Sequence, residues 1–241
     1  MSLSELILVR HGESTGNVAR ERALADGAEM ISIDRRDADV PLTELGCQQA
    51  IAFGAWLAAR PTDRRPDAVW CSTYLRARHT AELALDRAGL PLPITLDERL
   101  RDRELGMLDL LTATGISRRF PEEARRRAWL GKLYYRPPGG ESWADVALRL
   151  RSLLREVDQP AGPRRALLVC HDAVILLMRY ICEQFDEQSL FATARDGAIG
   201  NATVTVLRRT DDGWQPELVN HDEHLSTRAT EHPGERDDFG S

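Results

Sequence analysis

The sequence has little of what marks a secreted, disulfide-bonded or membrane protein. Its 241 residues include four cysteines, which lie far apart and form neither a CxxC pair nor a Cys/His ligand pattern: Cys47, Cys71, Cys170 and Cys182. We therefore expect reduced, buried thiols and no metal site. No apolar run approaches the roughly 18 residues that span a membrane. The start also lacks the basic and apolar regions of a signal peptide. These absences predict a cytoplasmic protein without membrane association.

A strong excess of one charge sign is also missing. The chain carries 32 basic and 38 acidic residues, a net charge of -6, and the two signs are interspersed along the sequence. This argues against a nucleic-acid partner, which requires a basic surface. A small anionic substrate would instead need a local basic pocket inside an acidic protein.

Hydrophobic residues make up 42% of the chain, enough for a substantial core. They fall in short extended runs that alternate with longer helical ones. Strands are expected over 5–9, 67–72, 92–100 and 165–170, helices over 42–59, 74–85, 143–157 and 173–185, and a terminal hairpin over 201–209 and 213–219. Thr43 and Ser142 are the expected N-caps of two of these helices. The alternation predicts an α/β fold, a three-layer α/β/α sandwich with a mainly parallel central sheet.

The chain shows no internal repeat and is expected to form one domain over residues 1–221. Within it, a basic helical insertion is expected around 107–140, helical over 115–136. Residues 222–241 are polar, lack core-forming side chains and are predicted to be a disordered tail. The tryptophans are expected to pack in the core or an interface: Trp56, Trp70, Trp129, Trp143 and Trp214. Four histidines outside any motif are expected on the surface or in the tail: His79, His221, His224 and His232.

Three of the predicted strands end in polar residues of the same kind. In an open α/β sheet, ligands bind at the carboxyl ends of the strands, so these residues are expected to converge. The first strand is followed by Arg10, His11, Gly12, Ser14 and Asn17; the second by Ser72, Thr73, Arg76 and Thr80; the fourth by His171 and Asp172. Arginine forks, neutral donors and helix N-termini together suit a tetrahedral dianion, which makes phosphate the expected ligand.

Binding alone would not require two histidines. A neutral imidazole attacks phosphorus when its other ring nitrogen donates a hydrogen bond that fixes the tautomer, and Gly12 allows the close backbone approach this needs. His11 is therefore the candidate nucleophile. His171, if protonated, would stabilise charge on the transferring group together with Arg10 and Arg76.

The reaction also needs an acid for the leaving oxygen, which afterwards activates water. The acidic stretch DERLRDRELG offers Asp97, Glu98, Asp102 and Glu104. Spacing alone does not choose among these four.

Taken together, the motifs resemble those of the histidine phosphatase superfamily, in its phosphoglycerate mutase-like branch. They are LVRHGES with Asn17, S-x3-R-x3-TA from Ser72 to Ala81, PGGES from Pro138 to Ser142, and a late LLVCH. The resemblance covers residues 5–207 and implies a phosphohistidine mechanism with no metal and no organic cofactor. It implies phosphate binding by Arg10, Asn17, Arg76 and His171, and phosphorylation of His11.

The resemblance also assigns the acid, with two departures from the family pattern. The family commonly has a glutamate in an L-x-E-x-x-x-G pattern, and Asp102 stands in that place, one methylene shorter. The second departure is Asp172, where this branch commonly has glycine. Because a related branch carries its proton donor in such a His-Asp pair, Asp172 is a rival to Asp102.

The resemblance covers both hydrolases and mutases. Gly16 stands where the glycolytic mutases have a tryptophan, and the segment from Asp102 to Glu141 is short, so water is expected to reach the site. We therefore predict a phosphomonoesterase acting on a small phosphorylated substrate; the alternatives are a phosphoglycerate mutase and a non-catalytic phospholigand sensor. Arg136 and the arginines of RRRAWLGK are expected to contact the rest of an anionic substrate. A homodimer is compatible with the sequence, which does not fix the oligomeric state.

Overall fold

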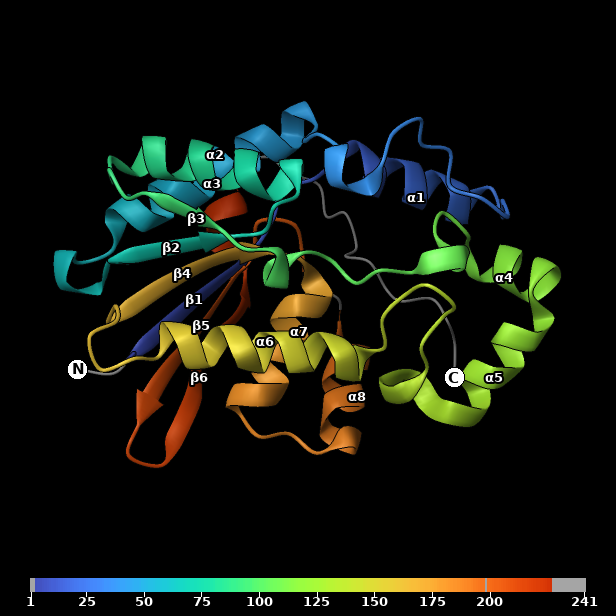
Figure 1. The fold of residues 1–241 in the computed structure, drawn as a ribbon. Helices are drawn as coiled ribbons and strands as arrows, with labels where there is room; N and C mark the ends of the chain where they lie inside the picture. Colours follow the sequence, from blue (N-terminus) through green and yellow to red (C-terminus); the bar gives the residue numbers. More distant parts are fainter. Residues whose placement is uncertain (1–2, 198, 227–241) are drawn as a thin grey trace.

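A six-stranded sheet lies at the centre of this computed structural model, which describes residues 3–197 and 199–226 (Figure 1). The strand order is β3-β2-β4-β1-β5-β6. The strands are β1 (Glu5–Arg10), β2 (Ala68–Cys71), β3 (Ile94–Leu96), β4 (Arg165–Cys170), β5 (Val204–Thr210) and β6 (Gly213–His221). The strands β3, β2, β4 and β1 run parallel to one another, with Leu8 opposite Leu168. β5 pairs antiparallel with β1 and forms an antiparallel hairpin with β6 at one edge. The predicted mainly parallel sheet is confirmed.

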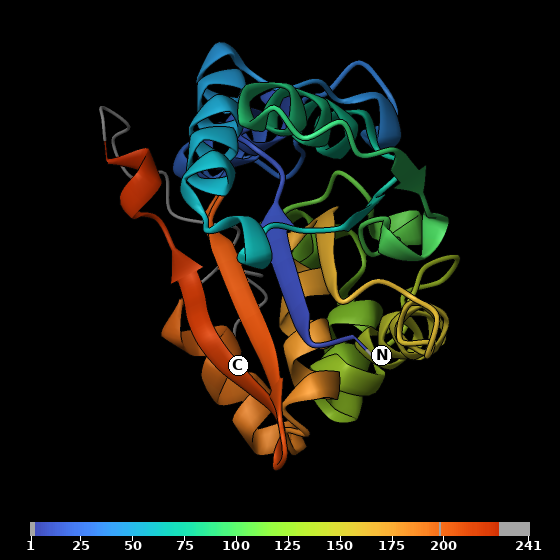
Figure 2. The same cartoon turned by 90° about the vertical axis from the view of Figure 1, so that its left-hand side faces the viewer.

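Both faces of the sheet are apolar because neighbouring residues of a strand point to opposite sides. In β1, Leu6 and Leu8 belong to one core cluster, and Ile7 and Val9 to the other. The first cluster is covered by α6 (Trp143–Val157) and α7 (Asp172–Cys182), and the second by α2 (Glu44–Ala59) and α3 (Leu75–Ala88). Figure 2 shows these helix layers on either side of the sheet. The predicted three-layer sandwich is therefore confirmed.

Two helices begin at the predicted caps. Thr43 accepts a hydrogen bond from the backbone N–H of Gly46 at the start of α2, and Ser142 accepts one from Asp145 at the start of α6. Two further helices, α1 (Thr15–Ala25) and α8 (Glu187–Asp196), were not expected from the sequence. Because only Asn17 and Ala23 are buried in α1, that helix has no apolar periodicity to detect.

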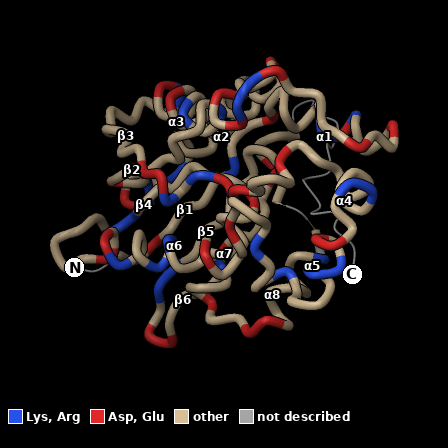
Figure 3. Tube along the Cα trace, turned by 45° about the vertical axis from the view of Figure 1, so that its right-hand side comes forward, with Lys and Arg blue, Asp and Glu red and all other residues tan. Residues whose placement is uncertain are grey.

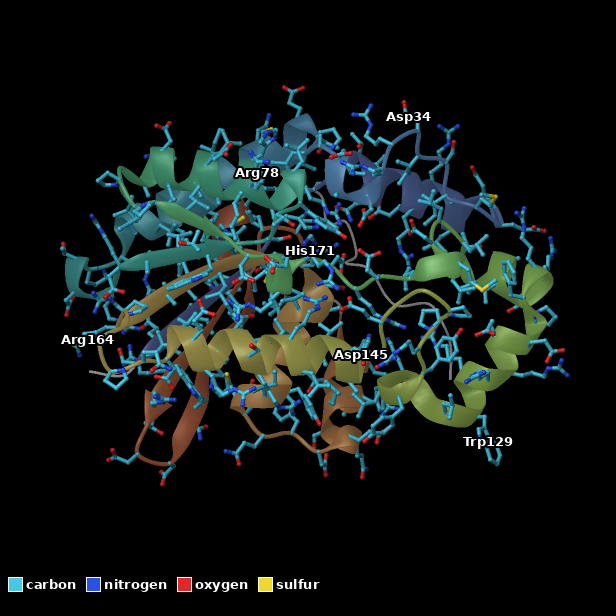
Figure 4. All side chains as sticks on the ribbon, in the orientation of Figure 1. Asp34, Arg78, Trp129, Asp145, Arg164 and His171 are labelled. Carbon is cyan, nitrogen blue, oxygen red and sulfur yellow. The ribbon has the colours of Figure 1, made fainter. Side chains whose placement is uncertain are left out.

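The expected insertion contains two helices, α4 (Ala113–Arg119) and α5 (Pro121–Tyr134), and α5 is kinked at Gly131, where φ is +75°. These helices lie beyond the end of the sheet (Figure 1). Trp129 extends outward from α5 and is 88% exposed, so it does not pack in the core, and its expected packing in an interface stays a prediction (Figure 4). The α5 helix is only weakly amphipathic, and its three consecutive arginines, residues 125–127, give it a largely solvated surface.

The packed part of the chain extends past the predicted start of the tail at residue 222. A short 3-10 helix, η5 (Glu223–Leu225), lies against α2, and His224 Nε2 donates to the carbonyl of Ala202 at 2.9 Å. The imidazole of His224 also lies 6.3 Å from the ring of Trp56. Residues 223–225 are therefore packed against the domain, and His224 is partly buried rather than a surface or tail residue. Residues 227–241, including His232, lie outside the described part.

Acidic and basic residues are mixed along the described trace, as the sequence indicated (Figure 3). Cys71, Cys170 and Cys182 are buried free thiols, and Cys47 is partly exposed. Within residues 3–197 and 199–226, no helix has the length and hydropathy needed to cross a membrane.

Candidate active site

The residues that follow β1, β2 and β4 meet at one place near the middle of the molecule. The imidazole rings of His11 and His171 lie 5.2 Å apart between centroids, in an edge-to-face arrangement. His11 is 2% exposed, His171 1% and Arg10 1%. Figure 4 places His171 where the strands end, far from the exposed Trp129. Side chains 160 positions apart therefore form one cluster beneath a cleft.

Two glycines allow the first turn of α2 to lie against the exit of β1. A β-carbon added to Gly12 would lie 2.4 Å from the carbonyl oxygen of Gly46, and one added to Gly46 would lie 1.9 Å from the carbonyl oxygen of Glu13. The backbone N–H of Gly12 also donates to Thr80 Oγ1 at 3.0 Å. The turn after His11 is thus fixed from α2 and from α3, which sets the direction of the imidazole.

The contacts of His11 define its tautomer. Nδ1 lies 2.7 Å from the carbonyl oxygen of Gly12, which can only accept, so Nδ1 carries the proton. Nε2 accepts from Arg76 Nε at 3.2 Å. Burial, followed by the charges of Arg76, His171 and Arg10, holds the pKa of His11 well below its usual value. His11 is therefore a neutral imidazole with its Nε2 lone pair directed into the site.

Arg76, in the first turn of α3, is held on several sides. Its Nη1 donates to the backbone carbonyl of Asp37 at 2.6 Å and to Asp37 Oδ1 at 2.9 Å, and its Nη2 donates to Oδ2 at 3.2 Å. Its Cζ lies 4.9 Å from the ring centroid of Tyr74. Neither Asp37 nor Tyr74 was expected in the site. Asp37 begins a short 3-10 helix between α1 and α2, where nothing in the local sequence pattern indicates this contact.

Arg10 and Asn17 are both held by the segment that precedes β5. Arg10 Nη1 donates to the carbonyl of Ile199 at 2.6 Å. Asn17 Oδ1 accepts from the backbone N–H of Ser14 at 2.9 Å and from Asn201 Nδ2 at 3.2 Å, so Asn17 caps α1 as well as lining the cleft. Asn201 also donates to the carbonyl of His11 at 3.1 Å, a role that the sequence did not indicate.

His171 precedes α7 and contacts β2 and the acidic loop. Its Nε2 is hydrogen-bonded to Ser72 Oγ at 2.9 Å, and its Nδ1 lies 3.6 Å from Asp102 Oδ2. Burial, followed by the charges of Arg76, Arg10 and Arg149, lowers the pKa of His171 well below its usual value. With these neighbours the imidazole of His171 is neutral. A bound dianion would favour the protonated form that the sequence-based role requires.

Among the four acidic candidates of the 97–104 stretch, Asp102 reaches the cluster. Asp102 Oδ2 lies 3.6 Å from both Arg76 Nη2 and His171 Nδ1. By contrast, Asp97 pairs with Arg99 at 2.6 Å. The shorter side chain of aspartate thus does not keep this carboxylate away from the site.

The loop that carries Asp102 is anchored from α6. Arg149 Nη2 donates to the carbonyl of Asp102 at 3.1 Å, and Glu141 accepts from Arg149 Nε at 3.0 Å and from Arg101 Nη2 at 2.7 Å. Glu141 therefore positions the loop instead of lining the cleft. Asp172, the rival acid, is the first residue of α7 and does line the cleft.

The cleft continues outward from this cluster between α1, the 31–37 loop and the start of the insertion. Its outer walls combine apolar and charged side chains: Arg20, Ile31, Ile33, Arg103, Leu105, Asp109, Leu110 and Leu111. The arginines of RRRAWLGK are not part of these walls, and Arg136 pairs with Asp145 at 2.6 Å. The expectation that these arginines contact the rest of an anionic substrate stays a prediction. No group of three acidic, histidine or cysteine residues in the described part of the chain could hold a metal ion.

Comparison with known proteins identifies the class to which this site belongs. Residues 6–222 match the model of the histidine phosphatase superfamily (branch 1), and the chain belongs to that family. The resemblance inferred from the motifs is thereby confirmed.

Among individual proteins, the relatives include both phosphatases and mutases. A glucosyl-3-phosphoglycerate phosphatase of Mycobacterium tuberculosis is 31% identical over 90% of this chain and 89% of its own length. A 2,3-bisphosphoglycerate-dependent phosphoglycerate mutase of Rhizobium etli is 36% identical, but over 60% of this chain and 62% of its own length. The chain thus matches about three-fifths of that mutase. A mycobacterial glucosyl-3-phosphoglycerate phosphatase solved in complex with VO3 has a TM-score of 0.69 at 29% identity, covering 91% of this chain and 100% of the other.

Proposed function

We propose that this chain is a metal-independent phosphomonoesterase that hydrolyses a small phosphorylated substrate through phosphorylation of His11. The observation that carries the proposal is the neutral imidazole of His11. Its Nδ1 donates a hydrogen bond to the carbonyl of Gly12, and its Nε2 faces Arg76. The carboxylate of Asp102 and the imidazole of His171 lie in the same site. A neutral nucleophile flanked by fixed cations is what attack on a phosphate dianion requires.

In the first step, the phosphoryl group lies between Arg10, Arg76 and the Nδ2 donors of Asn17, with phosphorus in front of His11 Nε2. Arg76 Nε, which donates to His11 Nε2, transfers its hydrogen bond to a phosphoryl oxygen. The freed Nε2 lone pair attacks phosphorus while the ester P–O bond breaks. Asp102 donates its proton to the leaving oxygen, which departs as an alcohol. His171, protonated beside the dianion, stabilises the transferring group.

In the second step, the carboxylate of Asp102 removes a proton from water, and the water oxygen attacks the phosphorus of phosphohistidine. The P–N bond breaks, inorganic phosphate leaves, and His11 regains its neutral form. The cations of Arg10 and Arg76 supply the positive charge throughout, so no step needs a metal ion.

Asp102 is the proton donor in this proposal, and Asp172 its rival. Support for Asp102 comes from its Oδ2, which lies 3.6 Å from Arg76 Nη2 and from His171 Nδ1, two side chains proposed to contact the phosphoryl group. A carboxyl group in this position also argues for turnover and against a sensor that only binds phosphorylated ligands.

Hydrolysis is favoured over mutase activity for two reasons. Gly16 lines the cleft at the position where the glycolytic mutases share a tryptophan. Because glycine has no side chain, this position leaves room for water. The match to the M. tuberculosis phosphatase also extends over 90% of this chain, against 60% for the R. etli mutase.

The proposal includes a cytoplasmic location and a single domain with its insertion at 107–140.

The test is a screen of phosphomonoesters with the unaltered protein and with His11→Ala. Release of inorganic phosphate that disappears in His11→Ala supports the proposal. Labelled 3-phosphoglycerate separates the alternatives, because rapid isomerisation to 2-phosphoglycerate with negligible free phosphate would identify a mutase. Binding of phosphorylated compounds without release of phosphate from any of them would identify a sensor.

A further inference from the structure

The guanidinium of Arg76 presents two edges with different tasks. The inner edge, Nε and Nη2, faces the reacting groups, with Nε 3.2 Å from His11 Nε2 and Nη2 3.6 Å from Asp102 Oδ2. The outer edge, Nη1 and Nη2, faces Asp37, which accepts through both carboxylate oxygens at 2.9 and 3.2 Å. The nucleophile and the Asp37 carboxylate therefore lie on different edges of the same planar cation.

A side chain as long as arginine needs several contacts to hold one orientation, because its rotamer entropy opposes ordering. The Tyr74 ring lies 4.9 Å from Cζ and restricts the plane of the guanidinium. Rotation within that plane is restricted by Asp37, since its carboxylate fork and its backbone carbonyl, 2.6 Å from Nη1, match three of the five donors. Together these contacts define one direction for Nε.

The loop that carries Asp37 is itself fixed. Asp37 begins a 3-10 helix, η1 (Asp37–Asp39), and its carbonyl also accepts from the backbone N–H of Val40 at 3.3 Å. The backbone N–H of Thr15 then donates to the carbonyl of Pro41 at 3.0 Å, which ties the loop to the start of α1. These backbone hydrogen bonds therefore fix the position of the Asp37 carboxylate.

We propose that Asp37 is a positioning residue for phosphoryl transfer, holding the outer edge of Arg76 so that the inner edge stays aimed at the phosphoryl group in front of His11. The inference rests on the proposed function. Because Asp37 lies on the outer edge, a phosphate bound at the inner edge does not displace it. Its negative charge weakens the binding of the ground-state dianion, while the fixed direction of Nε favours the transition state.

The experiment compares Asp37→Asn with Asp39→Asn in the full chain. Asparagine keeps the shape and one acceptor oxygen of Asp37 but removes its charge. Asp39 lies in the same 3-10 helix and pairs at 2.7 Å with Arg36, an exposed side chain outside the cleft, so it is a matched control. Both variants are assayed for kcat on the best substrate of the screen and for competitive inhibition by inorganic phosphate.

We expect Asp37→Asn to lower kcat about tenfold or more, as a misdirected catalytic contact does. At the same time its inhibition constant for phosphate should fall about fivefold, since a neighbouring negative charge has been removed. Asp39→Asn should match the unaltered protein in both. Asp37→Glu, with the fork restored on a longer stem, should recover part of kcat and return the phosphate constant towards its original value.

Slower turnover combined with tighter phosphate binding is the pattern that supports positioning. Partial unfolding would lower kcat and leave the phosphate constant unchanged, which would overturn the inference, as would kinetics equal to those of the control. A rise in kcat would show that Asp37 obstructs the site, and would also overturn it. If the unaltered protein hydrolyses no phosphomonoester, the proposed function fails; if the unaltered protein is active and Asp37→Asn behaves like Asp39→Asn, the inference alone fails.

Discussion

Replacing Arg76 by alanine should remove most of the affinity of the site for a phosphate-like anion. The inner edge of the guanidinium, Nε and Nη2, offers two charge-assisted hydrogen bonds, each contributing about 1.5–3 kcal/mol. Losing both costs about 3–6 kcal/mol, which corresponds to a rise of roughly a hundredfold to ten-thousandfold in a dissociation constant. The substitution also leaves the carboxylate of Asp37 without the cation that lies between it and the ligand site. Its repulsion of an anion places the expected effect towards the upper end.

The assay is the competitive inhibition constant for vanadate, an anion chosen because the mycobacterial relative has been solved in complex with VO3. Arg76→Lys is the matched control, since lysine keeps the charge but cannot present the planar fork. We expect it to fall between the unaltered protein and Arg76→Ala. An inhibition constant for Arg76→Ala within threefold of the original, in a protein that melts normally, would refute the arrangement of the phosphate site.

Three further predictions concern the acid, the backbone and the two histidines. Asp102→Asn should slow turnover by about a hundredfold or more with little change in vanadate inhibition. If Asp172→Asn slows turnover more than Asp102→Asn does, the assignment of the acid is reversed. Gly46→Ala places a β-carbon 1.9 Å from the carbonyl of Glu13, so it should cost about 1–3 kcal/mol of stability and most of the activity. The control Gly89→Ala has no atom within 4 Å of its β-carbon but a φ of +64°, so it should cost about 1 kcal/mol of stability and keep the activity. An equal loss of activity in the two variants would contradict the packing argument. Because the folded protein keeps both site histidines neutral while the unfolded chain protonates them below about 6.5, the free energy of unfolding should fall as pH drops below 6.5, by about 1.4 kcal/mol per pH unit for each histidine. Urea denaturation between pH 7.5 and 5.5 checks this, and a His11→Gln variant with an undiminished slope would contradict it.

The parts of the fold that the sequence predicts are those with strong periodicity or a clear local signal. Leu6 to Val9 are apolar at every position because both faces of β1 are covered, and a buried parallel strand is the structure that such a run favours. The N-cap residues Thr43 and Ser142 predict where α2 and α6 begin. By contrast, α1 is polar on most of its surface, so only the Ser14–Asn17 capping box marks its start.

The same distinction holds within the site. His11, Arg76 and His171 follow strands or begin helices, so the topology of a parallel sheet places them together. Asp37 and Asn201 reach the site from segments between the longer helices and strands, whose path depends on tertiary contacts rather than on a local pattern. For that reason the sequence indicates the groups that carry the chemistry but not those that orient them.

The central claim is that phosphate is transferred to Nε2 of His11, and one measurement tests it directly. The protein is mixed with an isotopically labelled phosphomonoester, quenched in alkali within milliseconds, and digested for mass spectrometry. We expect label on His11 as the Nε2 isomer of phosphohistidine, because Nδ1 donates its hydrogen bond to the carbonyl of Gly12. Label on any other residue, or undiminished hydrolysis by His11→Asn, would contradict it.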